Sequence, residues 1–479
     1  MEWEIVMGLE VHIELSTESK IFCGCSTKFG SSPNTHCCPI CLGMPGVLPV
    51  LNENVLKYAV KAGLALNCSI NLYNKFDRKN YFYPDLPKAY QISQLYIPYA
   101  QNGHVSLTKQ SGEVKEIRIH EIHMEEDACK LIHQPNGSET LLDYNRCGIP
   151  LLEIVSEPDF RDSEEVIAYL SKLRSIIVYL GISDCRLEEG SMRADVNLSV
   201  RPKGTAEFGT RTEMKNINSF RSIERAIAYE SKRQIALIKK GEAIIQETLR
   251  WDEEKGITRP MRSKEDAQDY RYFPEPDIPP IRISKEYLQS LKDEQPEFED
   301  SKINRYVNEL GLAEADARII ASIKQLADLF DNTCAMCKDP SEVRFWIVSQ
   351  ILYFMNERNL HPEDIKLSPD LFANFISTIK QGKISRQTGK QVFEKMFFSD
   401  DKFNIDEYIL ENGLQQVDDS DLLYEIITAV LKDNPKAVAQ YKGGQTKIIG
   451  YVIGQVMKKM AGKADPMTVK SMVEKALEE

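Results

Sequence analysis

The chain has 479 residues, of which 42% are hydrophobic and 28% charged, a composition typical of a folded protein with roughly two to four domains. Its 60 basic and 72 acidic side chains give a net charge of −12, which excludes a basic coat over the whole surface but allows local basic patches. No apolar run reaches about 18 residues, so a membrane span is excluded. The first residues show no basic stretch followed by an apolar one, so we expect no secretion or import signal and a cytoplasmic protein.

The first half of the chain mixes short alternating segments with Gly, Pro and Asn, which predicts α+β structure rich in sheet. Two helices are expected within it. Asp162 and Glu165 form a capping pair for a helix over residues 163–180, and Gly181 is its expected stop. The second helix is expected to follow Asn218.

Two changes in composition divide the chain. Four prolines in residues 274–280 predict a linker or an extended strap, and helical periodicity dominates from about residue 300. Residues 400–436 hold ten acids and three bases, whereas residues 441–463 hold five lysines and no acid. The expected fold class is α+β, with a β-rich cradle-like domain over 1–290, an all-α helical domain over 291–400 and a small helical tail domain over 401–479.

Two close cysteine pairs near the N-terminus predict a metal site. Two such pairs can supply four thiolates to a tetrahedral zinc ion, which leaves no open coordination position and so indicates a structural role. His36 and Cys37 are possible substitute ligands. The expected zinc ligands are Cys23, Cys25, Cys38 and Cys41.

Acidic and histidine side chains recur in four apolar segments. Glu10 and His12 alternate with apolar residues, so both lie on one face of a strand. The alternation before Glu125 changes parity, which a bulge or a strand end there would explain. Glu153 lies in an apolar run, and a carboxylate buried there must be paired or bound to metal. With Asp195, these side chains are candidates for an Mg²⁺ site open to phosphate, although an exposed polar strand face is the simpler alternative.

Cationic residues offer candidate phosphate contacts. Arg211, Glu213 and Lys215 share one strand face just before an expected helix N-terminus, a setting that suits an anion. Lys79 and Lys88 flank an aromatic segment that either stacks a base or forms a packed turn. Neither a dinucleotide-binding glycine motif nor a P-loop is present.

Six long motifs, found in the same order along the chain, resemble the B-subunit family of tRNA-dependent amidotransferases. The resemblance covers nearly the whole chain. It implies a β-rich cradle, a helical domain and a helical tail that contacts tRNA. The motifs are Met7–His12, Lys79–Asp85, His123–Asp127, Leu142–Asp159, Asp269–Asp277 and Gly450–Lys458.

The resemblance also implies an activity. Members work with an amidase-type A subunit and a small C subunit. The B-type member uses ATP and Mg²⁺ to phosphorylate the side-chain carboxylate of misacylated Glu-tRNA(Gln) or Asp-tRNA(Asn), and ammonia from glutamine then displaces the phosphate. The expected protein is therefore a carbon–nitrogen ligase. The alternative is a tRNA-binding scaffold of the same complex with no catalytic residues of its own.

By match to the family, individual residues receive expected roles. Some relatives lack the four cysteines, which supports a structural zinc. Glu126 and Glu157 are neighbouring acids that could replace a metal ligand. The expected Mg²⁺ ligands and catalytic residues are Glu10, His12, Glu125 and Glu153, with Asp195 as a further ligand. The expected phosphate contacts are Lys79, Arg211 and Lys215, and the expected tRNA contacts are Lys442, Lys447, Lys458, Lys459 and Lys463.

Overall fold

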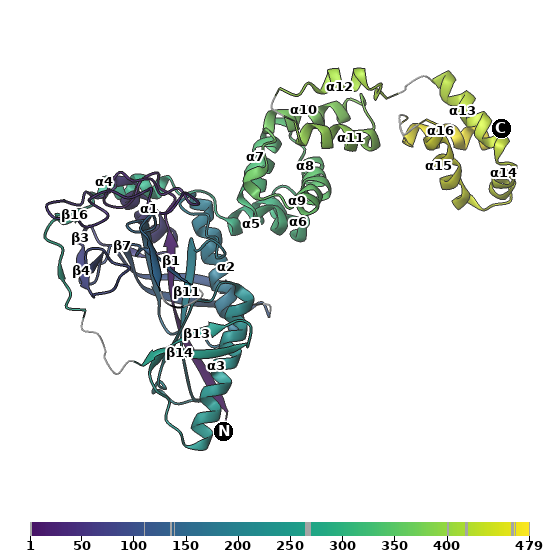
Figure 1. The fold of residues 1–479 in the computed structure, drawn as a ribbon. Helices are drawn as coiled ribbons and strands as arrows, with labels where there is room; N and C mark the ends of the chain where they lie inside the picture. Colours follow the sequence, from purple (N-terminus) through teal and green to yellow (C-terminus); the bar gives the residue numbers. More distant parts are fainter. Residues whose placement is uncertain are drawn as a thin grey trace. The chain divides into compact units, whose positions relative to one another are not determined.

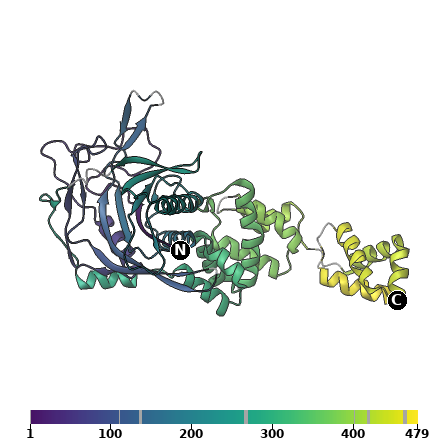
Figure 2. The same cartoon turned by 90° about the horizontal axis from the view of Figure 1, so that it is seen from below.

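The chain forms two compact units, Met1–Phe298 and Glu299–Glu479 (Figures 1 and 2). The first contains a mixed sheet with helices and the second is helical, which confirms the α+β fold class. The computed structural model describes residues 2–109, 111–134, 137, 139–263, 270–399, 402–416, 420–460, 464 and 466–478.

A nine-stranded sheet organises the first unit. Its neighbouring strands are antiparallel except for one parallel pair, β12 and β13. From one edge to the other the strands are β14 (Ile257–Ser263), β13 (Glu247–Asp252), β12 (Thr212–Lys215), β11 (Met192–Pro202), β1 (Trp3–Glu14), β10 (Pro150–Ser156), β7 (Val114–Glu126), β6 (Ala100–Thr108) and β2 (Ser69–Ile70). The N-terminal strand β1 is therefore the central one.

Three helices, α1 (Glu53–Ala65), α2 (Ser163–Leu180) and α3 (Phe220–Lys240), pack against the sheet and form the core with it. Leu9 and Val11 of β1 are buried in this core. Because side chains alternate along a strand, the residues between them project from the opposite face. The polar side chains of β1 are thereby kept apart from the helices.

The two helices expected from sequence are present. The Asp162 side chain accepts a hydrogen bond of 2.8 Å from the backbone N–H of Glu165, the predicted cap of α2. Gly181 ends α2 at a φ of 68°, a left-handed conformation that favours glycine. Ser219 caps α3, directly after Asn218.

The proline-rich segment is a strap pinned at both ends. β15 (Phe273–Pro274) pairs with β4 (Asp77–Asn80), and β16 (Ile281–Arg282) pairs with β3 (Tyr73–Asn74). The Arg78 guanidinium donates to both oxygens of Glu275 at 2.6 and 2.9 Å. The remaining elements of this unit are β5 (Tyr90–Ser93), β8 (Lys130–His133), β9 (Thr140–Asp143) and α4 (Lys285–Asp293).

The second unit contains two separate hydrophobic cores. One surrounds the fully buried Trp346 and includes residues from Ile303 to Leu414, and the other includes residues from Leu423 to Leu477. In the described part of the chain, no helix is long and apolar enough to cross a membrane. The α-helices of the first core are α5 (Glu299–Asn308), α6 (Glu314–Ala321), α7 (Lys324–Cys337), α8 (Pro340–Trp346), α9 (Leu352–Arg358), α10 (Pro369–Lys380), α11 (Arg386–Phe397) and α12 (Ile405–Glu411). Those of the second are α13 (Ser420–Asp433), α14 (Pro435–Lys442), α15 (Ile449–Lys459) and α16 (Pro466–Glu478).

Candidate active site and metal centres

The candidate active site lies on the sheet face that points away from the helices. A register shift opposite Val155 and Ser156 puts a bulge near residue 120 of β7, so a bulge and not a strand end explains the change in parity. Ile119 is therefore in the core, whereas His123 and Glu125 join the opposite face. Because of the bulge, residues of the same parity on β7 face the core before it and the candidate site after it.

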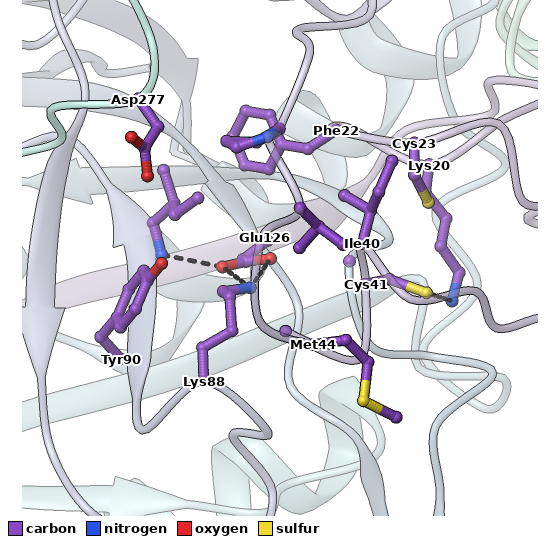
Figure 3. A pocket seen from close by; sticks show the side chains of 15 residues that line it. Lys20, Phe22, Cys23, Ile40, Cys41, Met44, Lys88, Tyr90, Glu126 and Asp277 are labelled. Carbon is purple, nitrogen blue, oxygen red and sulfur yellow. Dashed lines mark hydrogen bonds and ion pairs between the residues drawn. The ribbon is translucent and has the colours of Figure 1, made fainter.

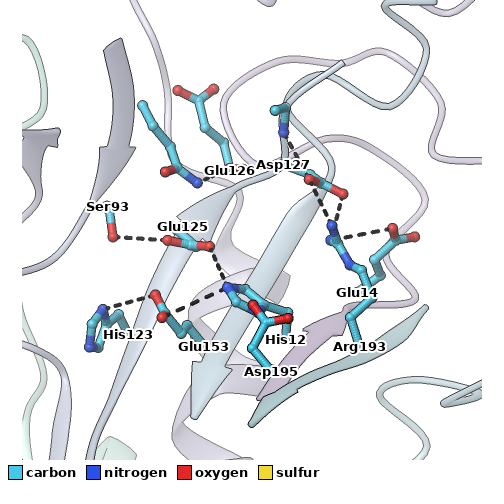
Figure 4. A network of polar contacts seen from close by, with 12 residues as sticks. His12, Glu14, Ser93, His123, Glu125, Glu126, Asp127, Glu153, Arg193 and Asp195 are labelled. Atoms are coloured by element: carbon cyan, nitrogen blue, oxygen red, sulfur yellow. Dashed lines mark hydrogen bonds and ion pairs between the residues drawn. The ribbon is translucent and has the colours of Figure 1, made fainter. Parts of the chain in front are cut away.

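Three predicted residues from three adjacent strands converge at the first group (Figure 4). His12 of β1 is directly opposite Glu153 of β10, and Glu153 is opposite His123 of β7. The His12 Nε2 atom lies 3.6 Å from a Glu125 oxygen and 3.8 Å from a Glu153 oxygen. Ser93 donates a hydrogen bond of 3.1 Å to the other Glu125 oxygen. One imidazole and two carboxylates thus offer ligand atoms within 4.8 Å of one another.

A second acidic group lies beside the first. Glu10, Asp195 and Glu213 also bring ligand atoms within 4.8 Å of one another. Glu10 of β1 is opposite Asp195 of β11 in the sheet. Lys215 Nζ contacts an Asp195 oxygen at 2.5 Å and a Glu213 oxygen at 2.9 Å, and the Asn197 amide donates to Glu10 at 3.0 Å.

The structure therefore divides the five predicted Mg²⁺ ligands between two groups. Glu10 and His12 point from the same strand face, and residues two apart on a strand are separated by roughly 6.6 Å. Glu10 is grouped with Asp195 of β11, whereas His12 is grouped with Glu153 of β10. The five predicted ligands therefore belong to two neighbouring groups of side chains, and which of them bind a metal ion stays a prediction.

Charge interactions set the protonation of the first group. Burial raises the pKa of Glu153, but interactions with the neighbouring His12, His123 and Lys79 side chains outweigh it and lower that pKa to about 2. Burial raises the pKa of Glu125, and the nearby Glu153 carboxylate adds to the rise. Burial and Glu153 likewise raise the pKa of Glu10. A cation bound among these carboxylates would relieve this repulsion, and in that respect the residues fit a divalent metal.

The predicted phosphate contacts occupy different environments. Burial lowers the pKa of Lys79, but the Glu125 carboxylate and neighbouring groups raise it above its ordinary value, so this side chain is a cation. The Lys79 ammonium lies 5.0 Å from the centroid of the Tyr270 ring. Lys215 is held between the carboxylates of the second group, whereas Arg211 is exposed.

The two alternative acids have other partners. Glu126 forms an ion pair of 2.6 Å with Lys88 and accepts a hydrogen bond from the Ile92 backbone N–H. Glu157 lies 2.9 Å from a nitrogen of His120. Among the described residues, neither acid belongs to either group.

The four predicted cysteines form a third group, with Sγ atoms within 4.8 Å of one another. In the described part of the chain this group contains neither His36 nor Cys37, whose thiol instead lies 3.2 Å from the Asn34 carbonyl. The hydrogen bond from Cys23 lowers the pKa of Cys41 to about 4, although burial opposes it. A thiolate at Cys41 is the form that binds metal.

One residue at the cysteine group gave no signal in the sequence. Lys20 is fully buried, and its ammonium lies 3.8 Å from the Cys41 sulfur (Figure 3). It also donates to the carbonyls of His36 at 2.7 Å and Tyr144 at 3.2 Å. Lys20 lines a cavity of about 130 Å³. The ion pair of Lys88 and Glu126 lines the same cavity.

Two family domains match the chain. Residues 5–289 match the GatB/GatE catalytic domain, and residues 328–477 match the GatB domain. The chain belongs to the GatB family. The first match contains all three side-chain groups described above, and the resemblance drawn from the six motifs is confirmed.

Similar proteins match over essentially their whole length. A protein of Lachnospira eligens is 54% identical over 482 residues, and one of Lachnoclostridium phytofermentans is 54% identical over 477 residues, each match covering 99% of both chains. A protein of Caldicellulosiruptor saccharolyticus is 50% identical over 481 residues, with 100% of both chains covered. All three are named as the B component of an aspartyl/glutamyl-tRNA(Asn/Gln) amidotransferase.

The tail lysines of this GatB-family chain are mostly on the surface. Lys442, Lys447 and Lys458 are exposed, and Lys459 is exposed but forms an ion pair of 2.8 Å with Asp433. Lys463 lies outside the described residues.

Proposed function

We propose that this chain is the GatB component of an aspartyl/glutamyl-tRNA(Asn/Gln) amidotransferase and activates the misacylated amino acid with ATP. The observation that carries the proposal is the convergence of His12, Glu125 and Glu153 within the part of the chain that matches the catalytic domain. The relatives of that name, which align over the whole chain, support the same assignment.

The reaction requires an activated carboxylate. Ammonia cannot displace oxide from the side chain of Glu or Asp. In the proposed step the side-chain carboxylate oxygen attacks the γ-phosphorus of ATP, and the bond from that phosphorus to the β–γ bridging oxygen breaks to release ADP. Ammonia then attacks the acyl carbon, loses a proton, and phosphate leaves with the former carboxylate oxygen. Positioning and charge neutralisation are the main tasks left to the protein.

The two acidic groups supply those requirements. Carboxylate oxygens are the ligands Mg²⁺ prefers, and we assign His12, Glu125 and Glu153 to one ion and Glu10, Asp195 and Glu213 to a second. Magnesium, when bound, neutralises phosphate charge. Lys79 holds a positive charge beside the first group, and Lys215 holds one at the second. Both are suited to orient phosphate oxygens, with Arg211 farther out.

The cysteine group is proposed to hold a structural zinc ion. Cys23, Cys25, Cys38 and Cys41 provide four sulfur ligands, the set that zinc binds in closed structural sites. Because four protein ligands leave no open position, this metal takes no part in the reaction.

The proposed partners follow from the same assignment. An amidase-type A subunit supplies ammonia from glutamine, a small C subunit completes the heterotrimer, and the substrate is Glu-tRNA(Gln), Asp-tRNA(Asn) or both. In this assignment the cradle of residues 1–290 binds the aminoacyl end, and the tail of residues 401–479 binds the tRNA body. The setting for this chemistry is the cytoplasm.

Formation of ADP that depends on misacylated tRNA tests the activity. In the assembled heterotrimer, His12→Ala and Glu125→Gln are expected to lower this rate at least about a hundredfold while leaving tRNA binding intact, because both residues lie in the first group. Glu116→Gln removes an exposed carboxylate from the same β7 strand and should retain the wild-type rate. Wild-type rates in both site variants would favour the scaffold alternative.

A further inference from the structure

The Glu213 carboxylate of the second acidic group has a partner at each of its oxygens. Lys215 contacts one oxygen at 2.9 Å, and the Thr248 hydroxyl donates a hydrogen bond of 2.9 Å to the other. Glu213 of β12 and Thr248 of β13 are directly opposite each other in the parallel pair of strands. Two contacts on two different oxygens fix the plane of a carboxylate, so Thr248 helps to set the direction in which Glu213 presents its oxygens.

The contact from Thr248 differs in kind from the contact made by Lys215. An ammonium repels a divalent cation, so the contact from Lys215 weakens when an ion binds among the carboxylates. A hydroxyl carries no charge, and it keeps its hydrogen bond to Glu213 while the other carboxylate oxygen binds the ion. Carboxylates that bind metals in proteins are commonly oriented by such outer hydrogen bonds. Thr248 is therefore suited to hold Glu213 both without and with a bound ion.

The strand that carries Thr248 is held on both sides from the helix face of the sheet. Glu230 of α3 is fully buried, and its carboxylate accepts hydrogen bonds from Thr212 at 3.0 Å and from Thr258 at 2.9 Å. Thr212 belongs to β12 and Thr258 to β14, the two strands that flank β13. Arg233 donates to both Glu230 oxygens at 2.8 Å and balances the buried charge. Because one carboxylate ties both flanking strands, β13 has little freedom to shift relative to β12.

Packing alone does not account for the hydroxyl of Thr248. This side chain is only 5% exposed, and valine has the same shape and is equally suited to a strand. A buried hydroxyl needs a hydrogen-bond partner, and here that partner is a candidate metal ligand.

We propose that Thr248 is a positioning residue that orients Glu213 for a divalent cation at the group of Glu10, Asp195 and Glu213. This role rests on the proposed function, which assigns an ion to the group but does not say what orients its ligands. The network around Glu230 keeps β12 and β13 in register, and the Thr248 hydroxyl converts that register into a fixed direction for the carboxylate.

Metal binding by the assembled heterotrimer tests this role without catalysis. Mn²⁺ takes the same kind of oxygen ligands as Mg²⁺, and its binding is followed by electron paramagnetic resonance. A His12→Ala background disables the first group, so the remaining bound Mn²⁺ reports the second. In that background Thr248→Val removes the hydroxyl, keeps the shape and should weaken Mn²⁺ binding by about tenfold to a hundredfold. Thr248→Ser should keep most of the affinity, because it retains the hydroxyl.

Matched variants separate positioning from stability. Thr17 is equally buried in the first unit and donates a hydrogen bond of 2.7 Å to the Ser19 carbonyl, so Thr17→Val should leave Mn²⁺ affinity unchanged. If Thr248→Val does not fold by circular dichroism, Thr248→Ala and Thr248→Ser give the same comparison of a side chain without and with the hydroxyl. With His12 intact, Thr248→Val should raise the Mg²⁺ concentration for half-maximal ADP formation by a larger factor than it lowers the rate at saturating Mg²⁺.

The outcomes distinguish this role from the proposed function. Equal Mn²⁺ affinity with Thr248 and with Thr248→Val would overturn the role and leave phosphorylation of the carboxylate standing. Equal weakening by Thr248→Val and Thr248→Ser would also overturn it, since the hydroxyl would then not be responsible. One Mn²⁺ in wild type and none in His12→Ala would remove the second ion and the role of Thr248, but not the first ion. A wild-type complex that binds no Mn²⁺ and forms no ADP would contradict the proposed function and this role together.

Discussion

The Lys20 ammonium is buried against two backbone carbonyls and the Cys41 sulfur. Four thiolates and one Zn²⁺ carry a net charge of −2, and a buried cation beside them offsets part of it. This residue is not predictable from sequence, because nothing local distinguishes it from a surface lysine. Its role depends on the fold of the chain, which brings Lys20 next to the segment that carries Cys41.

Substitution of Lys20 tests this charge compensation. Lys20→Met keeps the length of the side chain but removes the charge, so zinc should transfer to a chelating dye about tenfold faster. Lys28→Met changes an exposed lysine of the same loop and serves as the control. Equal transfer rates in wild type and Lys20→Met, with both proteins folded by circular dichroism, would rule out the role.

The strand face on which Glu213 lies could be predicted from the sequence. Its alternation with Arg211 and Lys215 places it on one strand face, but the pattern alone indicates a cationic surface. The structure shows that Lys215 contacts both Asp195 and Glu213, so Glu213 is part of an acidic group that surrounds a lysine. Side-chain parity is predictable from alternation, whereas the choice of neighbouring strand depends on residues far away in the chain.

At the scale of elements, α2 was predictable because its signals are local. The cap and the stop lie within a few residues of the helix they bound. Glu165 has a second role that the sequence did not reveal. Its carboxylate, only 1% exposed, contacts Lys109 at 2.5 Å and Lys115 at 2.7 Å and ties α2 to the ends of β6 and β7. Such contacts arise only once the sheet has formed.

Loss of this carboxylate should destabilise the first unit. Glu165→Gln is expected to lower the free energy of unfolding by about 1–3 kcal/mol, since it removes charged hydrogen bonds to partly exposed lysines. Burial raises the pKa of Glu165, but the hydrogen bonds from Lys109 and Lys115 lower it below its ordinary value. Because the pKa of Glu165 is lowered in the folded protein, its carboxylate stabilises the folded state at pH values above the pKa of the unfolded chain. This stabilisation is lost as the pH falls through the pKa of the folded protein.

Urea unfolding at several pH values measures the effect. The difference between wild type and Glu165→Gln should be full at pH 7 and shrink below about pH 4. Glu164→Gln, at the exposed neighbouring position, should stay within about 0.5 kcal/mol of wild type. A difference that persists unchanged at pH 3 would contradict the ion-pair explanation.

At the scale of the whole molecule, composition indicated a tail but not where its core begins. Ile405, Ile409 and Leu414 are buried in the core that surrounds Trp346. A deletion that begins at residue 405 would therefore expose the first helical core. Residues 420–479 contain the second core and the basic segment, so they are the piece to remove.

The tail is expected to hold the tRNA body through phosphates. Deleting residues 420–479, or changing Lys442, Lys447 and Lys458 to Gln, should raise the KM for misacylated tRNA and leave the KM for ATP unchanged. Each lost phosphate contact lowers the slope of log affinity against log salt by roughly 0.7–0.9. Lys239→Gln with Lys240→Gln, two exposed lysines of α3, provides the matched control. Identical salt slopes for wild type and the triple variant would show that the tail has only a structural role.

The central claim is that the side-chain carboxylate is phosphorylated at the His12, Glu125 and Glu153 group, and an oxygen label tests it directly. Misacylated Glu-tRNA(Gln) carrying ¹⁸O in both side-chain carboxylate oxygens is converted by the assembled heterotrimer with ATP and glutamine, and the released phosphate is analysed by mass spectrometry. The account predicts one ¹⁸O atom in each phosphate from wild type and no phosphate above background from His12→Ala. Amide product formed without ¹⁸O in the phosphate, or labelled phosphate from His12→Ala at the wild-type rate, would contradict it.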